Sequence, residues 1–302
     1  MVIALIVVAV LLIALLALGF ALASFSMTIR RQTLPEARAW QEKHYDLSWY
    51  DPLEKTDYTV RSFDGYELHA QLLKNSASST RYVIISHGIT DNRFGALKYA
   101  RFYLKLGFNA IIYDLRGHGE NETAFCSYSI REGRDLCALI SDARTRFRDV
   151  SVLGIHGESL GAATTVACLK AHPQVDFAVA DCGFSEITTI LQSGLSGMHM
   201  PPFLVHVASF CAKLRYGFFF HEMRPIDSLA ENDVPILFIH GAEDSFIPPR
   251  HSEAMAKATR GYSEVRLIPG AGHAASALTA PELYQEYLKA FLEKVLGTDG
   301  AN

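Results

Sequence analysis

The residues best suited to chemistry in this chain lie in the run Gly157-Glu158-Ser159-Leu160-Gly161. The apolar stretch 151–156 before it predicts a buried strand, and the small residues 162–170 after it predict a helix. A serine between such a strand and helix sits on a strained turn that exposes its Oγ, and the flanking glycines let the neighbouring backbone pack closely. We therefore expect Ser159 to be a nucleophile.

A serine hydroxyl is a weak nucleophile, so it needs a base, and the base needs an acid to orient it. Two later segments supply both groups. Residues 235–240 predict a strand whose following loop carries Asp244, and residues 265–268 predict a strand followed by a glycine-rich loop with His273. Because consecutive strand ends present them, we expect His273 to take the proton of Ser159 and Asp244 to hold the imidazole.

Two other carboxylates compete with Asp244 for the role of the acid. Glu243 is adjacent, but neighbouring side chains on a loop point apart. Asp181 ends the preceding predicted strand, where we expect it to shape the loop through hydrogen bonds from its side chain to the backbone. The sequence therefore favours Asp244.

A site for acyl transfer also needs two backbone N–H groups that bind the oxyanion. Leu160, directly after the nucleophile, supplies one of them. The loop 87–90, after the predicted strand 82–86, supplies the other. We select Ile89 as this second donor, because Gly88 before it leaves room for a substrate.

Charge and composition limit other kinds of chemistry. The chain has 302 residues, a formal net charge of −4 and no long basic block, which argues against nucleic acid as a partner. Its 12 histidines are scattered rather than clustered as in a metal site, and the expected reaction requires no metal and no organic cofactor. None of the five cysteines forms a CxxC pair, and we expect most of them to be small buried side chains.

The N-terminus has the composition of a membrane segment. Residues 2–23 contain no charged or polar side chain, and about 20 such residues in a helix cross the hydrocarbon layer. The run is longer than the apolar part of a usual signal peptide and no Lys or Arg precedes it, although its end resembles a small-x-small cleavage site. We expect residues 1–27 to be an uncleaved single-pass anchor whose partner is the lipid bilayer. Because Arg30, Arg31 and Arg38 follow it, the positive-inside tendency favours a cytoplasmic catalytic domain, with an extracytoplasmic domain as the alternative.

The rest of the chain predicts an α/β protein. Residues 28–56 predict a connector with helical character, and two β-rich runs then flank Asp64-Gly65, a strong hairpin signal. From residue 81 onward, apolar runs that end in glycine-containing loops alternate with helix-length stretches. This alternation predicts a mostly parallel twisted sheet with helices on both faces, in which ligands bind outside the C-terminal ends of the strands. We therefore assign residues 57–302 to one α/β domain.

The alternation breaks between residues 184 and 228, where we expect a small helical cap. Four large apolar residues of this insert recur at three- and four-residue steps: Phe203, Val207, Phe210 and Leu214. They predict one apolar helical face that packs onto the domain or contacts an acyl group. A cap rich in Phe and Met above a serine favours a substrate with an apolar portion.

Together these landmarks resemble those of the α/β-hydrolase superfamily. The matching loops are, in order, His87-Gly88, Asp114-Leu115-Arg116-Gly117-His118-Gly119, Gly157-x-Ser159-x-Gly161, His240-Gly241-x-x-Asp244-x-x-x-Pro248 and Gly272-His273-Ala274. The resemblance covers about residues 58–296. It implies an α/β-hydrolase fold, a triad in the order Ser, acid, His, and a structural role for the loop around Arg116. More narrowly, the chain resembles membrane-anchored bacterial serine hydrolases of the serine-aminopeptidase-like or lysophospholipase-like kind.

The sequence therefore predicts a membrane-anchored serine hydrolase that cleaves carboxylic esters through an acyl-enzyme. Its substrate is expected to be a small-molecule ester with an apolar acyl or alcohol portion. A peptidase or a thioesterase would use the same residues. A catalytically inactive membrane-bound interaction module is an alternative of another class, although a scaffold has no need of three reactive residues in the required order.

Overall fold

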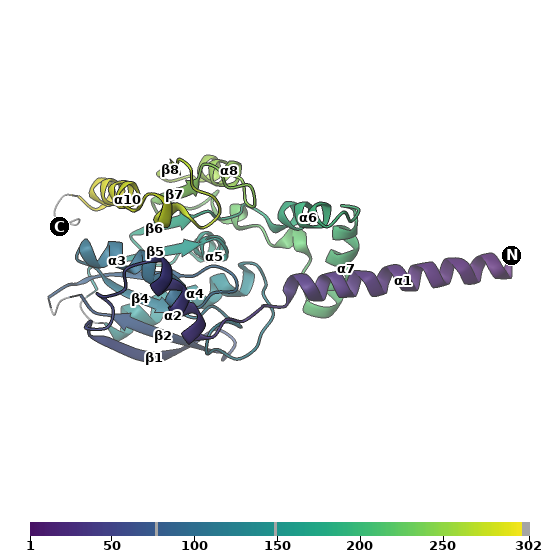
Figure 1. The fold of residues 1–302 in the computed structure, drawn as a ribbon, viewed down its shortest axis with the longest axis horizontal. Coiled ribbons are helices and arrows are strands. Elements are labelled where there is room, and N and C mark those ends of the chain that lie inside the picture. The colour runs from purple at the N-terminus through teal and green to yellow at the C-terminus, as the bar shows by residue number, and fades with distance from the viewer. Residues whose placement is uncertain (76–77, 148–149, 298–302) are drawn as a thin grey trace.

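In the computed structural model, which describes residues 1–75, 78–147 and 150–297, the apolar runs after residue 81 form the strands of one sheet (Figure 1). Counted over these residues, the sheet has eight strands: β1 Lys55–Arg61, β2 Glu67–Leu73, β3 Arg81–Ser86, β4 Asn109–Tyr113, β5 Val152–Glu158, β6 Phe177–Asp181, β7 Ile236–Gly241 and β8 Ser263–Ile268. Their order across the sheet is β1-β2-β4-β3-β5-β6-β7-β8. The pairs β1/β2 and β2/β4 are antiparallel, and all the other neighbours are parallel.

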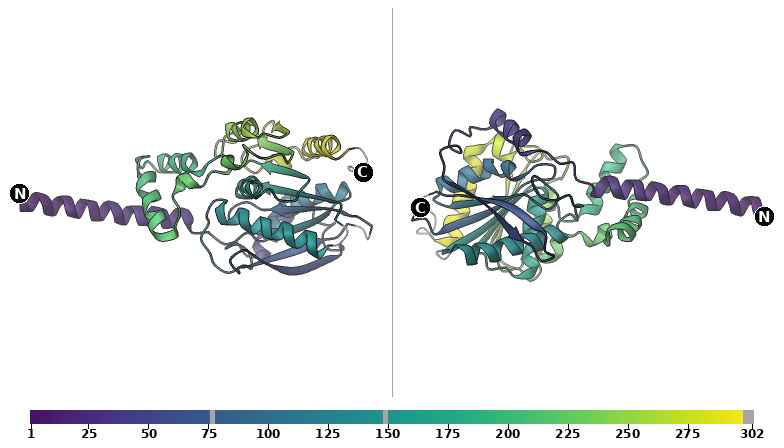
Figure 2. Two further views of the ribbon diagram at one scale, coloured as in Figure 1. Left: turned by 180° about the vertical axis from the view of Figure 1, so that it is seen from behind. Right: turned by 90° about the horizontal axis from the view of Figure 1, so that it is seen from below.

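Helices cover both faces of this sheet (Figure 2). The α-helices of the described residues are α1 Val2–Met27, α2 Leu34–His44, α3 Leu97–Lys105, α4 Ile130–Arg146, α5 Leu160–Cys168, α6 Ile187–Gly197, α7 Leu204–Tyr216, α8 Arg250–Ala258, α9 Ser276–Thr279 and α10 Pro281–Leu296. Side chains of α4, α5 and α8 belong to one buried cluster, and those of α3 and α10 belong to another. Along β3, Ile84 faces the first cluster while Val83 and Ile85 face the second, because successive strand side chains point to opposite faces. The predicted mostly parallel sheet with helices on both faces is confirmed.

The hairpin expected at Asp64-Gly65 joins β1 to β2. Ser62 N donates to Tyr66 O across the turn at 2.8 Å. Gly65 has a φ of 85°, a left-handed conformation that glycine adopts without a Cβ clash. This hairpin forms the antiparallel edge of the sheet, on the side away from β7 and β8.

The insert between residues 184 and 228 holds α6, α7 and two 3₁₀ turns, and it lies beside the long helix α1 (Figures 1 and 2). Helix α1 is long and apolar enough to cross a membrane. Its outer part projects away from the body of the molecule on the side of the cap, and its last turns pack against α7 (Figure 1).

The apolar face predicted for the cap helix is wrong for three of its four residues, since only Val207 packs against the protein. Phe203, Phe210 and Leu214 are exposed, at 57%, 48% and 62%, so they do not form a buried face. The buried side of α7 instead carries Leu204 and Val205 near its start and then four smaller residues, Ala208, Ser209, Cys211 and Ala212. Val207 and Cys211 lie against Gly19 of α1, where the two helices approach closely.

Candidate active site

Ser159 occupies the turn between β5 and α5, with φ 52° and ψ −110°. These angles are unfavourable for a residue with a Cβ, so the surrounding backbone must hold them. The turn is tight enough that a Cβ on Gly157 would lie 2.0 Å from the carbonyl oxygen of Gly161, and one on Gly161 would lie 2.2 Å from that of Ser86. Ser159 N donates to Asp181 O at 2.8 Å, which ties the turn to β6. Only glycines at both flanking positions allow this close approach.

The structure brings Ser159, His273 and Asp244 into one hydrogen-bonded chain. Ser159 Oγ lies 3.0 Å from His273 Nε2, and His273 Nδ1 lies 2.7 Å from Asp244 Oδ2. With the proton on Nδ1, the imidazole donates to the carboxylate and accepts from the serine hydroxyl. The Phe246 ring contacts the His273 ring edge-on, with 5.0 Å between centroids. The predicted nucleophile, base and acid therefore meet in the expected order and at hydrogen-bonding distances.

The carboxylate of Asp244 is fixed by donors on both oxygens. Oδ1 accepts from Phe246 N at 3.0 Å and from Ile247 N at 2.8 Å. Oδ2, besides accepting from His273, lies 3.3 Å from Nε2 of the buried His240. Burial acts to raise the pKa of Asp244, but the hydrogen bonds from His240 and His273 outweigh it and hold the pKa well below its usual range. Asp244 is therefore an anion whose orientation does not depend on the substrate.

Neither competing carboxylate contacts His273 through a hydrogen bond in the described structure. Glu243 is exposed. Asp181 is fully buried, and its side chain accepts from Tyr99 Oη at 3.0 Å and Ser276 Oγ at 3.3 Å. The expectation that its side chain binds the backbone is wrong, because its carboxylate oxygens accept from these two side-chain hydroxyls instead. Burial raises the pKa of Asp181 to about 6, and the neighbouring Glu158 carboxylate adds to this effect.

The two backbone groups expected to bind an oxyanion lie on either side of Ser159. Leu160 begins α5, and Ile89 lines the same cavity as Ser159. A Cβ on Gly88 would lie 3.8 Å from the Cβ of Ser159, so this loop passes directly beside the nucleophile. The buried ring of His87 holds the loop: its Nε2 accepts from Leu115 N at 2.9 Å, and its Nδ1 donates to Gly88 O at 2.7 Å. His87 is neutral near pH 7, because burial lowers its pKa to about 4.

A second group that supports the site, next to Ser159, was not identified from the sequence. Glu158 forms a buried ion pair with Lys98 and accepts from Tyr99 Oη. Burial acts to lower the pKa of Lys98, but the Glu158 carboxylate raises it above its usual range. Lys98 lies in an amphipathic stretch, where a lysine is normally exposed, so the sequence did not indicate that it pairs with Glu158.

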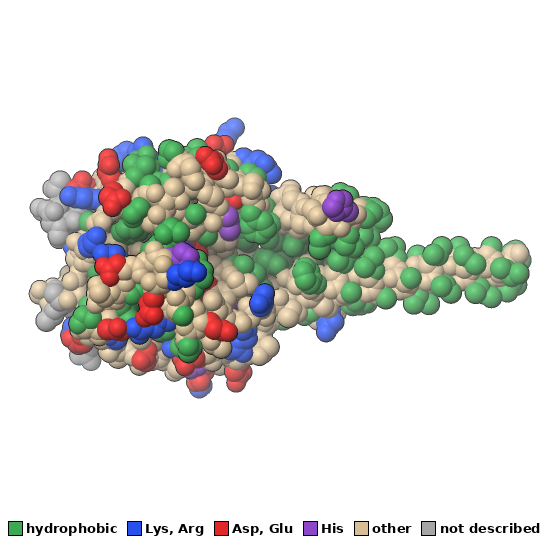
Figure 3. All heavy atoms as spheres, viewed as in Figure 1, with side chains coloured by type: hydrophobic (Ala, Val, Ile, Leu, Met, Phe, Trp, Pro, Cys, Tyr) green, Lys and Arg blue, Asp and Glu red, His purple; other side chains and the backbone are tan. Residues whose placement is uncertain are grey.

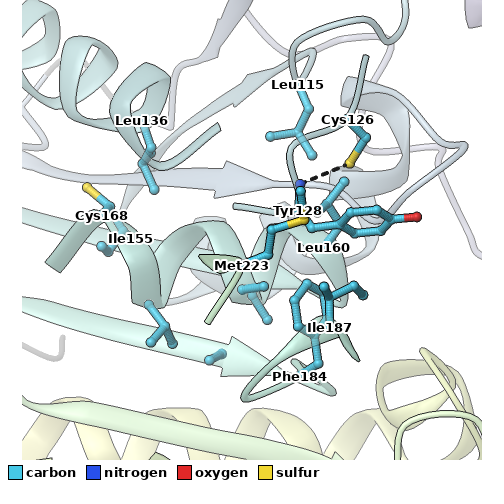
Figure 4. Close-up of a cluster of buried hydrophobic side chains, with 14 of the residues drawn as sticks. Leu115, Cys126, Tyr128, Leu136, Ile155, Leu160, Cys168, Phe184, Ile187 and Met223 are labelled. Carbon is cyan, nitrogen blue, oxygen red and sulfur yellow. Dashed lines mark hydrogen bonds between the residues drawn. The ribbon is translucent and has the colours of Figure 1, made fainter. Parts of the chain in front are cut away.

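An apolar cavity of about 190 Å³ opens at Ser159 between the sheet and the cap. It exceeds the roughly 150 Å³ of an engineered cavity that accommodates benzene. Tyr128, Leu160, Phe184 and Ile187 are among its walls and belong to one buried cluster (Figure 4). The cavity also includes three residues from the end of α1, namely Leu22, Phe25 and Ser26. Sequence reasoning did not connect the N-terminal segment with the site.

Another cavity, of about 390 Å³, is lined in part by His273 and Ile89. Its walls include the side chains of Asp91, Lys98 and Glu158, so it is far more polar than the first. Ser159 thus lines an apolar cavity and His273 a polar one. This arrangement suits a substrate with an apolar acyl part and a polar leaving group.

Among the described residues, Cys182, Asp244 and His273 place three possible metal-ligand atoms within 4.8 Å of one another. The five cysteines are free thiols, and burial raises the pKa of the Cys182 thiol well above its usual value. A thiolate, not a thiol, binds metals. The Nδ1 atom of His273 also donates to Asp244. The chemistry of this group therefore fits the proton relay of a hydrolase better than a metal centre.

Comparison with known proteins gives consistent matches over most of the chain. A model of the prolyl oligopeptidase family matches residues 96–299. The uncharacterized protein YqkD of Bacillus subtilis is 29% identical over 286 residues, which cover 92% of this chain and 93% of that protein. The human alpha/beta hydrolase domain-containing protein 17B is 25% identical over 260 residues, covering 85% and 78%. A solved structure of the Pyrococcus furiosus esterase PF2001 superposes with a TM-score of 0.68 at 20% identity, covering 82% of this chain and 93% of that one. The predicted α/β-hydrolase fold is confirmed.

Proposed function

Because this chain belongs to the prolyl oligopeptidase family, within the α/β-hydrolase superfamily, we propose that it is a membrane-anchored serine hydrolase that cleaves carboxylic esters. The observation that carries the proposal is the chain of hydrogen bonds from Ser159 through His273 to Asp244 at the mouth of an apolar cavity. An acyl group fits the apolar cavity, and the leaving alcohol fits the polar cavity that His273 lines.

The reaction follows from the positions of these groups. His273 Nε2 takes the proton of Ser159 as Oγ attacks the ester carbonyl, and Asp244 stabilises the imidazolium that forms. The amides of Ile89 and Leu160 bind the oxyanion of the tetrahedral intermediate. His273 then protonates the leaving alkoxide, which departs as the alcohol and leaves an acyl-enzyme. A water molecule, deprotonated by His273, attacks the acyl-enzyme and releases the acid and the free serine.

Two alternatives use the same residues with another leaving group. The match to the prolyl oligopeptidase family favours a peptidase, and the apolar cavity accommodates a thioester equally well. A panel of short- and long-chain esters, acyl thioesters and aminoacyl amides separates them by their kcat/KM values. An inactive interaction module is disfavoured because it has no need for a serine held in an unfavourable backbone conformation beside a base.

The direct test is labelling with a fluorophosphonate probe. The wild-type protein should be labelled on Ser159 and should hydrolyse p-nitrophenyl acetate. Ser159→Ala should lose the label and about 10⁴-fold or more of the turnover, since the loss of a triad nucleophile costs several powers of ten. Ser185→Ala, a serine of similar burial that does not touch His273, is the matched control and should keep both. Undiminished labelling of Ser159→Ala contradicts the proposal.

The membrane assignment has its own test. Helix α1 supports a single-pass anchor, and the arginines that follow it support a catalytic domain in the cytoplasm. The protein should stay in the membrane fraction through high-salt and alkaline washes, and the domain should resist protease added to intact cells. A soluble form cut after Ala23 would replace the anchor with a signal peptide, whereas digestion in intact cells would reverse the orientation only.

A further inference from the structure

Helix α1 has two parts that differ in their surroundings. Residues 2–14 are exposed throughout. From Leu15 onward, one side of the helix is buried or half-buried at three- and four-residue steps, including Gly19, Ala23 and Met27. The first part thus projects from the molecule, while the second part is built into the protein.

The contact between α1 and α7 is close. A Cβ on Gly19 would lie 2.7 Å from Cys211 Sγ and 2.8 Å from a methyl carbon of Val207. Arg215 donates to Ser24 Oγ at 2.7 Å near the end of the same interface. This small-residue approach is the usual way in which helices pack inside a membrane.

The length of the projecting part of α1 determines how deeply the cap would enter a bilayer that α1 spans. Residues 2–14 make about 20 Å of helix, at 1.5 Å per residue. The hydrocarbon core of a bilayer is about 30 Å thick, so the projecting part cannot cross it alone. The remaining 10 Å or so must come from the part of α1 that packs on α7. An α1 that spans the membrane therefore draws the outer surface of the cap into the bilayer.

The outer surface of the cap is suited to that environment. Hydrophobic side chains cover α1 and gather where it meets the cap (Figure 3). Five large apolar residues of α1 and the cap are exposed there by 48 to 74%: Phe25, Met198, Phe203, Phe210 and Leu214. In water such a surface would be costly, since apolar surface buried from water contributes about 25 cal/mol per Å².

The catalytic cavity opens on this same region. Leu22, Phe25 and Ser26 of α1 form part of its wall, together with Leu195, Met198 and Val205 of the cap. The Tyr128 hydroxyl, at the cavity wall, donates to Ser26 O at 2.6 Å, so α1 also satisfies a polar group there. The anchor is thus one wall of the acyl site.

We propose that α1 is a specificity element, which completes the acyl-binding cavity so that the enzyme takes long-chain acyl esters directly from the bilayer that α1 spans. This inference rests on the proposed ester hydrolysis and adds the substrate class. A chain dissolved in the membrane passes between α1 and the cap to Ser159, and the polar leaving group faces the polar cavity on the protein side.

The test separates α1 from α7 without changing the reacting groups. Gly19→Leu places a side chain where a Cβ alone already meets Cys211 and Val207. The ratio of kcat/KM for p-nitrophenyl decanoate to that for the acetate should fall by about tenfold or more, because each lost methylene contact in an apolar pocket counts severalfold. Ala17→Leu, on the exposed side of α1, is the matched control and should leave the ratio within about twofold.

A second variant guards against a folding failure. Leu22→Trp fills the cavity from α1 and should lower the decanoate-to-acetate ratio while fluorophosphonate labelling persists. An unchanged ratio in both variants, with labelling intact, overturns the inference but leaves the proposed function standing. A wild-type protein that hydrolyses no ester and takes no label refutes the proposed function instead.

The source of the substrate is tested with the full chain reconstituted in phosphatidylcholine vesicles that contain p-nitrophenyl decanoate. When the total amount of ester per volume of suspension is kept constant, added lipid dilutes the ester within the bilayer. The rate of hydrolysis should then fall. Hydrolysis that follows the bulk concentration alone would show that the substrate arrives from water, which contradicts entry from the membrane.

Discussion

Replacing Asp244 by Asn tests the proposed acid, because two backbone amides fix the orientation of the side chain at this position. Oδ1 of Asp244 accepts from the amides of Phe246 and Ile247, at 3.0 and 2.8 Å. The carbonyl oxygen of Asn must take this position, which leaves its NH₂ group where Oδ2 now faces His273 Nδ1 at 2.7 Å. The NH₂ group then donates to Nδ1. The proton moves to Nε2, which points at Ser159 Oγ and can no longer accept its proton.

The magnitude follows from the cost of the alternative arrangement. To restore the productive tautomer, the Asn side chain must flip and set its NH₂ group against two backbone N–H donors. Each buried donor left without an acceptor costs about 1–3 kcal/mol, or about 2–6 kcal/mol for the two. Loss of the negative charge beside the imidazolium adds to this. We expect kcat for p-nitrophenyl acetate to fall by about 10⁴-fold, equivalent to about 5.4 kcal/mol.

The matched control for this variant is Asp181→Asn, which also changes a buried carboxylate at the end of a neighbouring strand. Its partners are the hydroxyls of Tyr99 and Ser276, and these can reorient toward an amide. We expect it to lose less than about tenfold of kcat. Thermal melts of both variants establish that they are folded. If Asp181→Asn lost more activity than Asp244→Asn, the assignment of the acid would be refuted.

Three further predictions concern stability. Because burial raises the pKa of Asp181 to about 6, above roughly 3.9 in the unfolded chain, the folded state retains a proton that the unfolded state releases. The contribution of Asp181 to the free energy of unfolding should therefore fall as the pH rises from about 4 to about 6, so urea melts should show the wild type losing stability relative to Asp181→Asn over this range. Gly161→Ala should destabilise the fold by about 3 kcal/mol or more through its clash with backbone, whereas Gly194→Ala, with no atom within 4 Å, should stabilise it by about 0.5–1 kcal/mol. A chain that starts at Arg30 should melt well below one that starts at Ala14, because only the latter keeps the buried turns of α1.

Each of these predictions has a clear contrary result. A wild-type stability that rises relative to that of Asp181→Asn between about pH 4 and 6 would mean that Asp181 ionises more readily in the folded state than in the unfolded one. Equal denaturation midpoints for the two glycine variants would contradict the tight turn at the nucleophile. Equal melting temperatures for the two shortened chains would show that the buried end of α1 is not part of the core.

The residues of the proposed relay could be found from the sequence because each lies in the segment that follows a strand. The parallel strands of such a sheet present their C-terminal ends at one edge, so residue type and strand order were enough to bring Ser159, Asp244 and His273 together. The supporting groups could not be found in this way. Lys98 and Glu158 pair across segments far apart in the chain, and no local spacing distinguishes this lysine from a solvated one.

The packing of α1 was hidden for a different reason. A segment that is apolar on every side has no stripe that indicates which side meets protein, so length alone decided its interpretation as an anchor. The only local signal was the spacing of Gly19 and Ala23, two small residues four apart in the manner of helix pairs in membranes. That spacing marks the side of α1 that α7 covers.

The cap helix shows why the pattern misled. In a protein surrounded by water, the large apolar side chains of a helix face the core. This rule led to the prediction that Phe203, Phe210 and Leu214 face inward. In the structure these three are exposed, whereas Val207 packs on α1 and Ala208 and Ala212 are buried. Inside a bilayer no hydrophobic gain favours large residues between helices, and small residues let two backbones approach. The exposure of the three large residues is therefore what the proposed immersion of the cap in lipid requires, and the small buried residues of α7 fit its close contact with α1.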